Sequence, residues 1–325
     1  MKNRIFSLTT LSQRHSPFTP IHRNLSTTTT VTPPPNPPSN AHPKKTLLQD
    51  LSPTALNYYW DTPEPTEEQL AYANKFFARS RHSPFRVWSA AKFRTTPIDT
   101  GTPEVAFLGR SNTGKSSLLN HIMDDKVCYA SSKPGRTVTM NAFGVGGTKG
   151  GESKVILLDM PGYGKGSRTQ WGQEIMKYLK KRKQLRRAFI MIDGEHGLKY
   201  SDKEILEMFR HYAIPHQVIV SKVDKILAKR KSQIQTGITN ESILAVHKSL
   251  EKLRPIVQPK GRTEGPPALG ELLTSSSSAY RSSRDYLGVA AIRWAILSAA
   301  GYDGTMEVKA EQLVSPASTT AEEEP

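Results

Sequence analysis

Phosphate chemistry is the first function that the residue pattern indicates. Residues 107–120 read FLGRSNTGKSSLLN, in which a glycine is followed by four residues and then by Gly-Lys-Ser. Turns of this spacing point backbone N–H groups inward around phosphates, and the helix that follows adds the positive end of its dipole. Lys115 would reach the β- and γ-phosphates of a nucleotide, and the Ser116 hydroxyl would be a ligand of Mg²⁺.

A second motif, DMPG, closes the next apolar run. Its Asp159 is placed to hold Mg²⁺ through water, and the backbone N–H of Gly162 to contact a γ-phosphate. Between the two motifs lies KPGRTVT (133–139). A threonine in such a segment can close over the metal when a γ-phosphate is present and release it after hydrolysis. Thr137 is the first choice for this role and Thr139 the alternate.

The motif SKVD (221–224) contains the residues that would recognise the base. The Asp224 carboxylate can accept hydrogen bonds from guanine N1–H and the exocyclic amine, whereas adenine lacks both donors, and sites built for donors reject ligands that lack them. The Lys222 stem would cover the face of the base. Backbone N–H groups of TSSS (274–277), at Ser275 and Ser276, would meet guanine O6, and Ser282-Ser283 is a second candidate.

These motifs define three overlapping groups of predicted site residues. Hydrolysis is assigned to Lys115, Thr137 and Gly162, and the metal to Ser116, Thr137 and Asp159. The nucleotide-binding set is Gly109, Arg110, Ser111, Asn112, Thr113, Gly114, Lys115, Ser116, Ser117, Pro134, Gly135, Arg136, Thr137, Asp159, Gly162, Ser221, Lys222, Asp224, Ser275 and Ser276.

Alternating strands and helices must position these motifs. Continuous apolar runs, typical of buried parallel strands, cover 104–109, 154–159, 188–193, 216–221 and 270–276. Helix-like patterns cover 115–123, 169–183, 201–212, 241–253 and 288–300, and 140–147 is an expected antiparallel edge strand. The order predicts an α/β fold, a doubly wound and mostly parallel sheet with helices on both faces.

Taken together, the motifs resemble the EngB/YihA/YsxC family of ribosome-assembly GTPases, P-loop GTPases of the TRAFAC class. The resemblance rests on GRSNTGKSSLLN, SSKPGRTVTMN, DMPGYGKG, IDGEHGLKYSD and SKVD, and covers about residues 100–300. It implies GTP and GDP as ligands, Mg²⁺ as cofactor, and ribosomal large-subunit precursors with their rRNA as partners. The chain departs from the family at Ser221, where Asn or Thr is usual, and at Glu195, where Arg is common. Residues 226–268 are longer than a compact bacterial form needs.

The residue after the DMPG glycine bears on how GTP would be hydrolysed. Tyr163 follows the DMPG glycine, at a position where a glutamine can orient the attacking water. Tyr163 cannot orient the water in the same way, and this leaves three alternatives. Intrinsic turnover is slow, a partner supplies a catalytic group, or a monovalent cation supplies the charge. Asn112 is the P-loop asparagine that several GTPases of this class use to bind K⁺, so K⁺ activation is a hypothesis.

Charge indicates an anionic partner. The chain has 325 residues and a formal net charge of +16. Nine Lys/Arg lie between residues 165 and 187, directly after DMPGYG, and nine more between 225 and 262. Backbone contacts to RNA are therefore expected, from the first stretch more than from the second, with a solvated charged face as the alternative.

Both ends of the chain have compositions typical of tails. The protein is expected to be a monomer. Residues 1–49 are rich in Ser, Thr and Pro and contain no acidic residue, which is typical of an organelle transit peptide followed by a Pro-rich linker. Mitochondrial matrix is preferred over plastid because Arg23-Asn24-Leu25-Ser26 resembles a presequence cleavage site. Residues 50–100 are an expected extension that joins the core near residue 85, 101–303 the GTPase domain, and 304–325 a disordered tail.

Alternatives remain at this point. A single cysteine, Cys128, excludes an intramolecular disulfide, and no apolar run reaches the roughly 18 residues of a membrane span. One rival function is a GTP-dependent regulator that recruits a protein partner without hydrolysis. A P-loop ATPase or small-molecule kinase is another, and Asp224 argues against it.

Overall fold

The computed structural model describes residues 45–97, 101–128, 139–163, 169–228, 234, 236–261, 268–276 and 286–303. The expected transit peptide, most of the linker and the C-terminal tail lie outside these residues. So do Pro134, Gly135, Arg136 and Thr137 and the alternative pair Ser282-Ser283.

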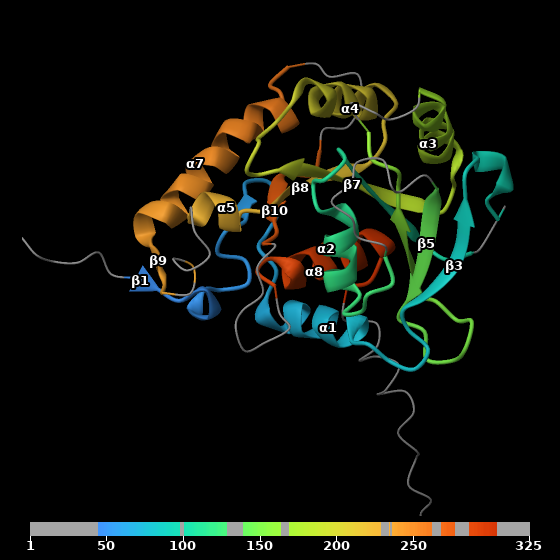
Figure 1. Cartoon of the computed structure of the whole chain (residues 1–325), viewed down its shortest axis with the longest axis horizontal. Helices are drawn as coiled ribbons and strands as arrows, with labels where there is room; N and C mark the ends of the chain where they lie inside the picture. Colours follow the sequence, from blue (N-terminus) through green and yellow to red (C-terminus); the bar gives the residue numbers. More distant parts are fainter. Residues whose placement is uncertain are drawn as a thin grey trace, which may run out of the picture. The chain divides into compact units, whose positions relative to one another are not determined.

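A single mixed sheet of eight strands organises the fold (Figure 1). Its order is β2-β10-β8-β7-β4-β6-β5-β3. The five central strands, β10, β8, β7, β4 and β6, run parallel, and β2, β5 and β3 pair antiparallel at the two sides. The strands are β2 Tyr58–Tyr59, β3 Phe85–Ala90, β4 Glu104–Gly109, β5 Met140–Val145, β6 Val155–Asp159, β7 Leu185–Asp193, β8 His216–Ser221 and β10 Glu271–Thr274.

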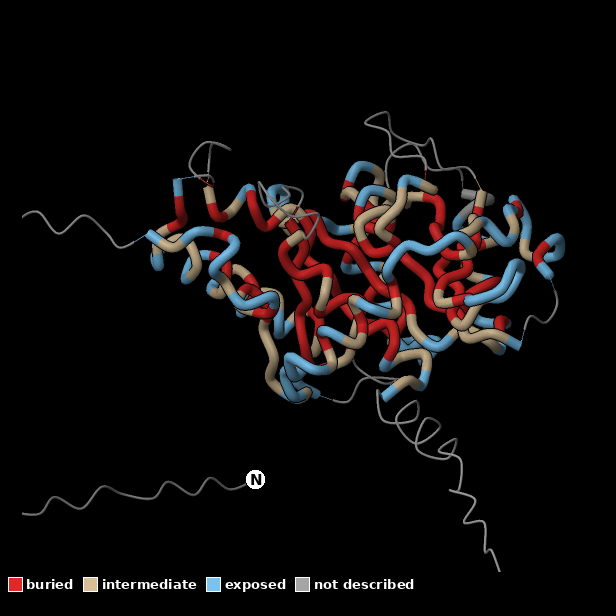
Figure 2. Tube along the Cα trace, turned by 90° about the horizontal axis from the view of Figure 1, so that it is seen from below, coloured by how far each residue is buried: buried red, intermediate tan, exposed pale blue. Residues whose placement is uncertain are grey.

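Helices cover both faces of this sheet, as the sequence predicts. One buried cluster joins the sheet to α1 (Glu67–Phe77), α2 (Lys115–Ile122) and α8 (Val289–Ala300). The other joins it to α3 (Thr169–Lys181), α4 (Tyr200–His211) and α7 (Asn240–Val257). Figure 2 shows the buried residues running through the interior of the molecule between these layers. Alternate side chains of each strand point to opposite faces, which is why continuous apolar runs are needed.

The predicted elements are largely confirmed, with one correction to the sheet. The strand over 104–109 and the strand over 216–221 have the expected bounds. Strand β5 is antiparallel as expected, but it is not an edge strand, because β3 pairs with its outer side. Residues 85–90 therefore close the sheet, a role that their mixed polar and apolar pattern did not indicate.

The N-terminal extension belongs to the core from residue 45 onward, rather than from near residue 85. Leu48 and Leu56 are 5% and 1% exposed and join the core cluster. Strand β1 (Lys45–Thr46) pairs with β9 (Ile238–Thr239), which lies within the long segment 226–268. The extension and this segment therefore pack on each other.

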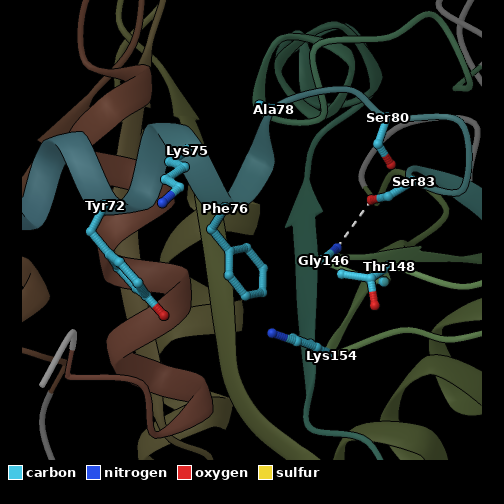
Figure 3. Close-up of a pocket in the computed structure, with 10 residues that line it drawn as sticks. Tyr72, Lys75, Phe76, Ala78, Ser80, Ser83, Gly146, Thr148 and Lys154 are labelled. Atoms are coloured by element: carbon cyan, nitrogen blue, oxygen red, sulfur yellow. Dashed lines mark hydrogen bonds between the residues drawn. The ribbon is translucent and has the colours of Figure 1, made fainter. Parts of the chain in front are cut away.

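Helix α1 is fixed against the turn that follows β5. Thr66 and Gln69 form the expected capping box at its start. At its other end Phe76 points toward Gly146, where a Cβ would lie only 2.4 Å from the phenyl ring, and φ is +77° (Figure 3). The hydroxyl of Ser83 accepts a 3.0 Å hydrogen bond from the Gly146 N–H, and both residues line a hollow of about 250 Å³. Glycine is thus required at this contact.

Among the described residues, no helix is both long and apolar enough to cross a bilayer.

Candidate functional site

The predicted motifs meet at the carboxyl ends of the central strands. The parallel register aligns Phe107 with Asp159, and Asp193 with Ser221, so β4, β6, β7 and β8 all end at one edge of the sheet. Ligands of open α/β sheets bind at this edge. Residues as far apart in sequence as Thr113 and Ser221, 108 positions, are thereby brought into one site.

The phosphate-binding motif forms a turn between β4 and α2. Lys115 is 6% exposed and pairs with Asp159, the last residue of β6, which is 2% exposed. The Ser116 hydroxyl donates a 3.0 Å hydrogen bond to the other carboxylate oxygen of Asp159. The three side chains assigned to phosphate and metal are therefore in direct contact.

The chemistry of this group fits Mg²⁺. A hydroxyl and a carboxylate offer the hard oxygen ligands that this ion prefers, and Mg²⁺ usually keeps several waters alongside one or two protein ligands. Lys115 now neutralises Asp159. A nucleotide would draw the ammonium toward its phosphates and leave the carboxylate facing the cation.

The DMPG turn rests on the phosphate-binding turn. A Cβ on Gly162 would lie 3.0 Å from the backbone nitrogen of Ser111, closer than ordinary packing allows. The next backbone N–H, of Tyr163, donates to the Gly109 carbonyl oxygen at 3.2 Å. Gly162 is thus held at the phosphate end of the site, where its assigned contact would have to be made.

Arg110 and Tyr163 turn their side chains away from this end. The Arg110 guanidinium donates to both carboxylate oxygens of Asp202, at 3.0 and 3.2 Å, and to the Gly197 carbonyl at 3.1 Å. The Tyr163 hydroxyl donates to Asp202 at 2.9 Å. Burial, followed by the Asp202 charge, raises the pKa of Tyr163 well above its usual value. The Arg110 side chain is thus engaged by α4, so only its backbone is placed to serve a nucleotide.

Sequence reasoning did not single out Asp202, which is fully buried in α4. Its carboxylate also accepts a 2.8 Å hydrogen bond from the Lys199 backbone N–H at the start of the helix. An acidic residue in a first helical turn reads as an ordinary capping group, so nothing in the sequence indicated its two distant partners.

The guanine motif is tied to the phosphate-binding turn. The Ser221 hydroxyl donates to the Thr113 carbonyl at 2.7 Å and is 3% exposed. It therefore links the guanine motif to the phosphate-binding turn. The Lys222 ammonium donates at 2.7 Å to Asp193, at the end of β7.

Asp193 is a second residue that the site prediction omitted. Burial alone would raise its pKa, but hydrogen bonds from Lys222 and the His196 backbone N–H outweigh burial and lower it. Asp193 thus stays ionised and fixes the Lys222 stem. The signal available in the sequence was an aspartate at a strand end next to a glycine.

Asp224, the residue assigned to the base, is the first residue of α5 (Asp224–Leu227) and is 1% exposed. The expectation for Ser275 and Ser276 is not met. The Ser275 N–H donates to Val220 O at 2.9 Å and the Ser276 N–H to Leu287 O at 3.2 Å, so both donors are engaged within the protein. A contact to guanine O6 would have to come from another group.

The remaining predicted residues are placed as follows. Asn112 and Ser117 are exposed on the turn and first helical turn, and the Thr113 hydroxyl donates to the Arg110 carbonyl at 2.9 Å. Thr139, the alternate to Thr137, donates to Asn141 at 3.2 Å. Pro134 to Thr137 lie outside the described residues and their assignments stay predictions.

Comparison with known proteins agrees with this geometry. Residues 104–222 match the family model of the 50S ribosome-binding GTPases. The GTP-binding protein EngB of Bartonella bacilliformis is 36% identical over 208 residues, which are 61% of this chain and 85% of that protein. The chain belongs to the EngB family of GTP-binding proteins. This EngB-family chain is accordingly a P-loop GTP hydrolase with guanine nucleotides as ligands.

Two further similarities were found. EngB of a Chelativorans species is 41% identical over 135 residues, 39% of this chain and 60% of that protein. A crystal structure of an EngB protein aligns with a TM-score of 0.36 and 20% identity, covering 61% of this EngB-family chain and 98% of that one.

Proposed function

We propose that this GTPase acts as a switch in assembly of the large ribosomal subunit of mitochondria. It binds precursor particles and their rRNA in the GTP state, with Mg²⁺ held by Ser116 and Asp159, and leaves after hydrolysis. The observation that carries the proposal is the contact group of Lys115, Ser116 and Asp159 in a chain of the EngB family. Bound Mg²⁺ would supply charge stabilisation at the phosphates.

The ribosomal part of the proposal has support from the matching family description, 50S ribosome-binding GTPase, and from the charge of the chain. The mitochondrial part is supported by the acid-free, Ser- and Arg-bearing N-terminus, with a plastid as the alternative destination.

A basic surface on and after α3 is the proposed RNA contact. Part of the stretch is structural, because Arg182 is 7% exposed and pairs with Glu104 at 2.6 Å, and Arg187 donates to Gln217 at 2.9 Å. The exposed cations of the described part are Lys177, Lys180, Lys181, Lys183 and Arg186. This set follows the DMPGY turn in sequence, so nucleotide state and RNA affinity can be coupled through it.

The decisive experiment is co-sedimentation of the full chain with mitochondrial ribosomal subunits. A non-hydrolysable GTP analogue, GDP and an ATP analogue are compared. Binding to the large subunit with the GTP analogue alone is expected, and it should weaken as salt rises. Nucleotide-independent binding, or none, would remove the assembly role and redirect the search to protein partners.

A matched pair of variants locates the RNA surface. Lys181→Ala/Lys183→Ala/Arg186→Ala should weaken subunit binding and reduce its salt dependence, since each lost phosphate contact lowers the slope. Lys75→Ala/Arg81→Ala/Lys149→Ala removes three exposed charges outside both basic stretches and serves as the control. Equal losses in both variants would argue for non-specific charge attraction.

A further inference from the structure

The N-terminal extension reaches the guanine end of the site. Strand β2 pairs antiparallel with β10, aligning Tyr59 with Glu271 and Tyr58 with Leu272. The residue before β2, Asn57, is 4% exposed and points its side chain at the end of β10. That end leads directly into Ser275 and Ser276, the segment adjoining the guanine motif.

Asn57 makes three hydrogen bonds there. Its Oδ1 accepts from both the backbone N–H and the hydroxyl of Thr274, each at 2.8 Å, and its Nδ2 donates to the Tyr59 hydroxyl at 2.9 Å. His247 of α7 lies 3.0 Å from the Ala55 carbonyl oxygen and steadies the same turn. The long segment 226–268 thus supports the position of Asn57 from outside.

A continuous series of backbone hydrogen bonds leads from this point to Asp224. The residue after Thr274, Ser275, donates to Val220 O at 2.9 Å, and its carbonyl accepts from the Val223 N–H at 3.2 Å. Val223 immediately precedes Asp224, the buried first residue of α5. A shift at Thr274 would therefore displace the peptide that carries the Asp224 carboxylate.

We propose that Asn57 is a positioning residue for guanine recognition, acting through Thr274 and Ser275 on Asp224. The proposal rests on the assignment of Asp224 to the guanine N1–H and amine. It gives the extension and segment 226–268 a shared task, because both hold the turn that carries Asn57. Asn57 does not itself contact the nucleotide.

Other contacts of the extension provide a matched control. The Thr62 hydroxyl donates at 2.7 Å to Glu271, and the Trp60 and Asp61 N–H groups each donate to the Gly270 carbonyl at 3.1 Å. These contacts hold the opposite end of β10, three residues before Thr274. Thr62→Val should therefore weaken the same sheet edge without moving the turn at Val223.

The test is the affinity of the full chain for GDP, IDP and ADP. IDP lacks the amine that Asp224 is assigned to bind, so the GDP/IDP affinity ratio reports the position of that carboxylate. We expect Asn57→Ala to lower GDP affinity about tenfold, the loss typical of one well-placed hydrogen bond, and to reduce the ratio toward one. Thr62→Val should lower Tm and leave the ratio unchanged.

Two further variants keep the result decisive if Asn57→Ala folds poorly. Thr274→Val retains the N–H to Asn57 but loses the hydroxyl contact, so it should give a smaller reduction of the ratio, and Thr274→Ser should restore it. The effects of Asn57→Ala and Asp224→Asn should be non-additive, because they act on one contact.

The variants distinguish failure of the positioning role of Asn57 from failure of the guanine contact assigned to Asp224. If Asp224→Asn reduces GDP affinity while Asn57→Ala and Thr274→Val leave the ratio unchanged, Asn57 has no positioning role and the guanine assignment stands. If Asp224→Asn itself leaves GDP affinity unchanged, the assignment of the base contact fails, and the positioning role fails with it.

Discussion

The hydroxyl of Tyr163 donates a 2.9 Å hydrogen bond to Asp202, and the same carboxylate accepts two hydrogen bonds from Arg110. This buried aspartate of α4 therefore joins the turn after DMPG to the phosphate-binding turn. Tyr163 takes the position at which a glutamine would orient water in related chemistry. Because its hydroxyl donates a hydrogen bond to Asp202, the Tyr163 side chain anchors the turn after DMPG.

Replacing Tyr163 by Phe tests this anchoring role. The variant loses a hydrogen bond to a charged group, while Arg110 and the Lys199 N–H still satisfy Asp202. We expect the free energy of unfolding to fall by about 1.5–3 kcal/mol. Intrinsic GTP turnover at saturation should change by less than about threefold, far below the 10²-fold typical of a lost acid–base group. Single-turnover kinetics and denaturant unfolding measure the two effects.

A loss of tenfold or more in the turnover of folded Tyr163→Phe would contradict the anchoring role and make the hydroxyl a catalytic group. Tyr200→Phe is the control, because Tyr200 is 76% exposed on the same helix as Asp202.

The ion pair between Arg182 and Glu104 predicts a separate effect on stability. Arg182 belongs to the basic stretch by sequence, but its charge lies in the core, with N···O 2.6 Å. Glu104→Gln should destabilise the fold by about 3–5 kcal/mol, because it leaves a buried guanidinium without its counter-charge. Lys183→Gln, on the exposed part of the same stretch, should change Tm little. Equal Tm values for the two variants would show that the pair contributes no net stability.

Local sequence patterns predicted the positions of Lys115, Ser116, Asp159 and Asp224 because each closes or follows a short apolar run, and strand ends meet at one edge of a parallel sheet. They did not predict the role of Asp202, whose partners lie 92 and 39 residues away in the chain. Periodicity tells which face of a helix is buried but not which side chain it meets. The prediction that Ser275 and Ser276 bind guanine O6 was wrong for a related reason. A sequence pattern does not reveal that their backbone N–H groups already donate hydrogen bonds to the carbonyl oxygens of Val220 and Leu287.

Stability should depend on pH through His121. Burial, with a smaller effect of the Arg293 guanidinium, lowers its pKa from 6.5 to about 4, and its ring stacks on Tyr286 at 3.4 Å between centroids. Below pH 6.5 the unfolded chain binds a proton that the folded chain does not, so stability falls as pH drops from 6.5 toward 4. His121→Gln should show a shallower decline of Tm in this window.

The raised pKa of Glu271 acts in the opposite direction, because stability from that group is lost as pH rises above its ordinary value of 4.5. The comparison with His121→Gln isolates the histidine from this effect. Parallel Tm curves for the two proteins would contradict the assignment.

Asp224→Asn should change which base is bound. An amide can donate to the 2-oxo group of xanthine but cannot accept both guanine donors, so preference should move from GTP to XTP. A change of about 10²-fold or more in the affinity ratio is expected, because unpaired polar groups in such a site are strongly penalised. Competition between labelled GDP and XDP measures it. An unchanged ratio would show that Asp224 does not make the base contact assigned to it.

Potassium is the last determinant of turnover to be tested. Asn112 lies exposed on the phosphate-binding turn, so its side chain is accessible to a cation. A cation there would stabilise charge that develops in the transition state, in place of the group that Tyr163 cannot supply. We expect GTP turnover about tenfold or more higher in KCl than in NaCl, in the range of one added electrostatic stabiliser. Asn112→Ala should abolish the difference. The measurement is made at constant ionic strength, with and without ribosomal subunits. Equal turnover in both salts under both conditions would exclude the cation, and the missing catalytic group would then have to come from a partner.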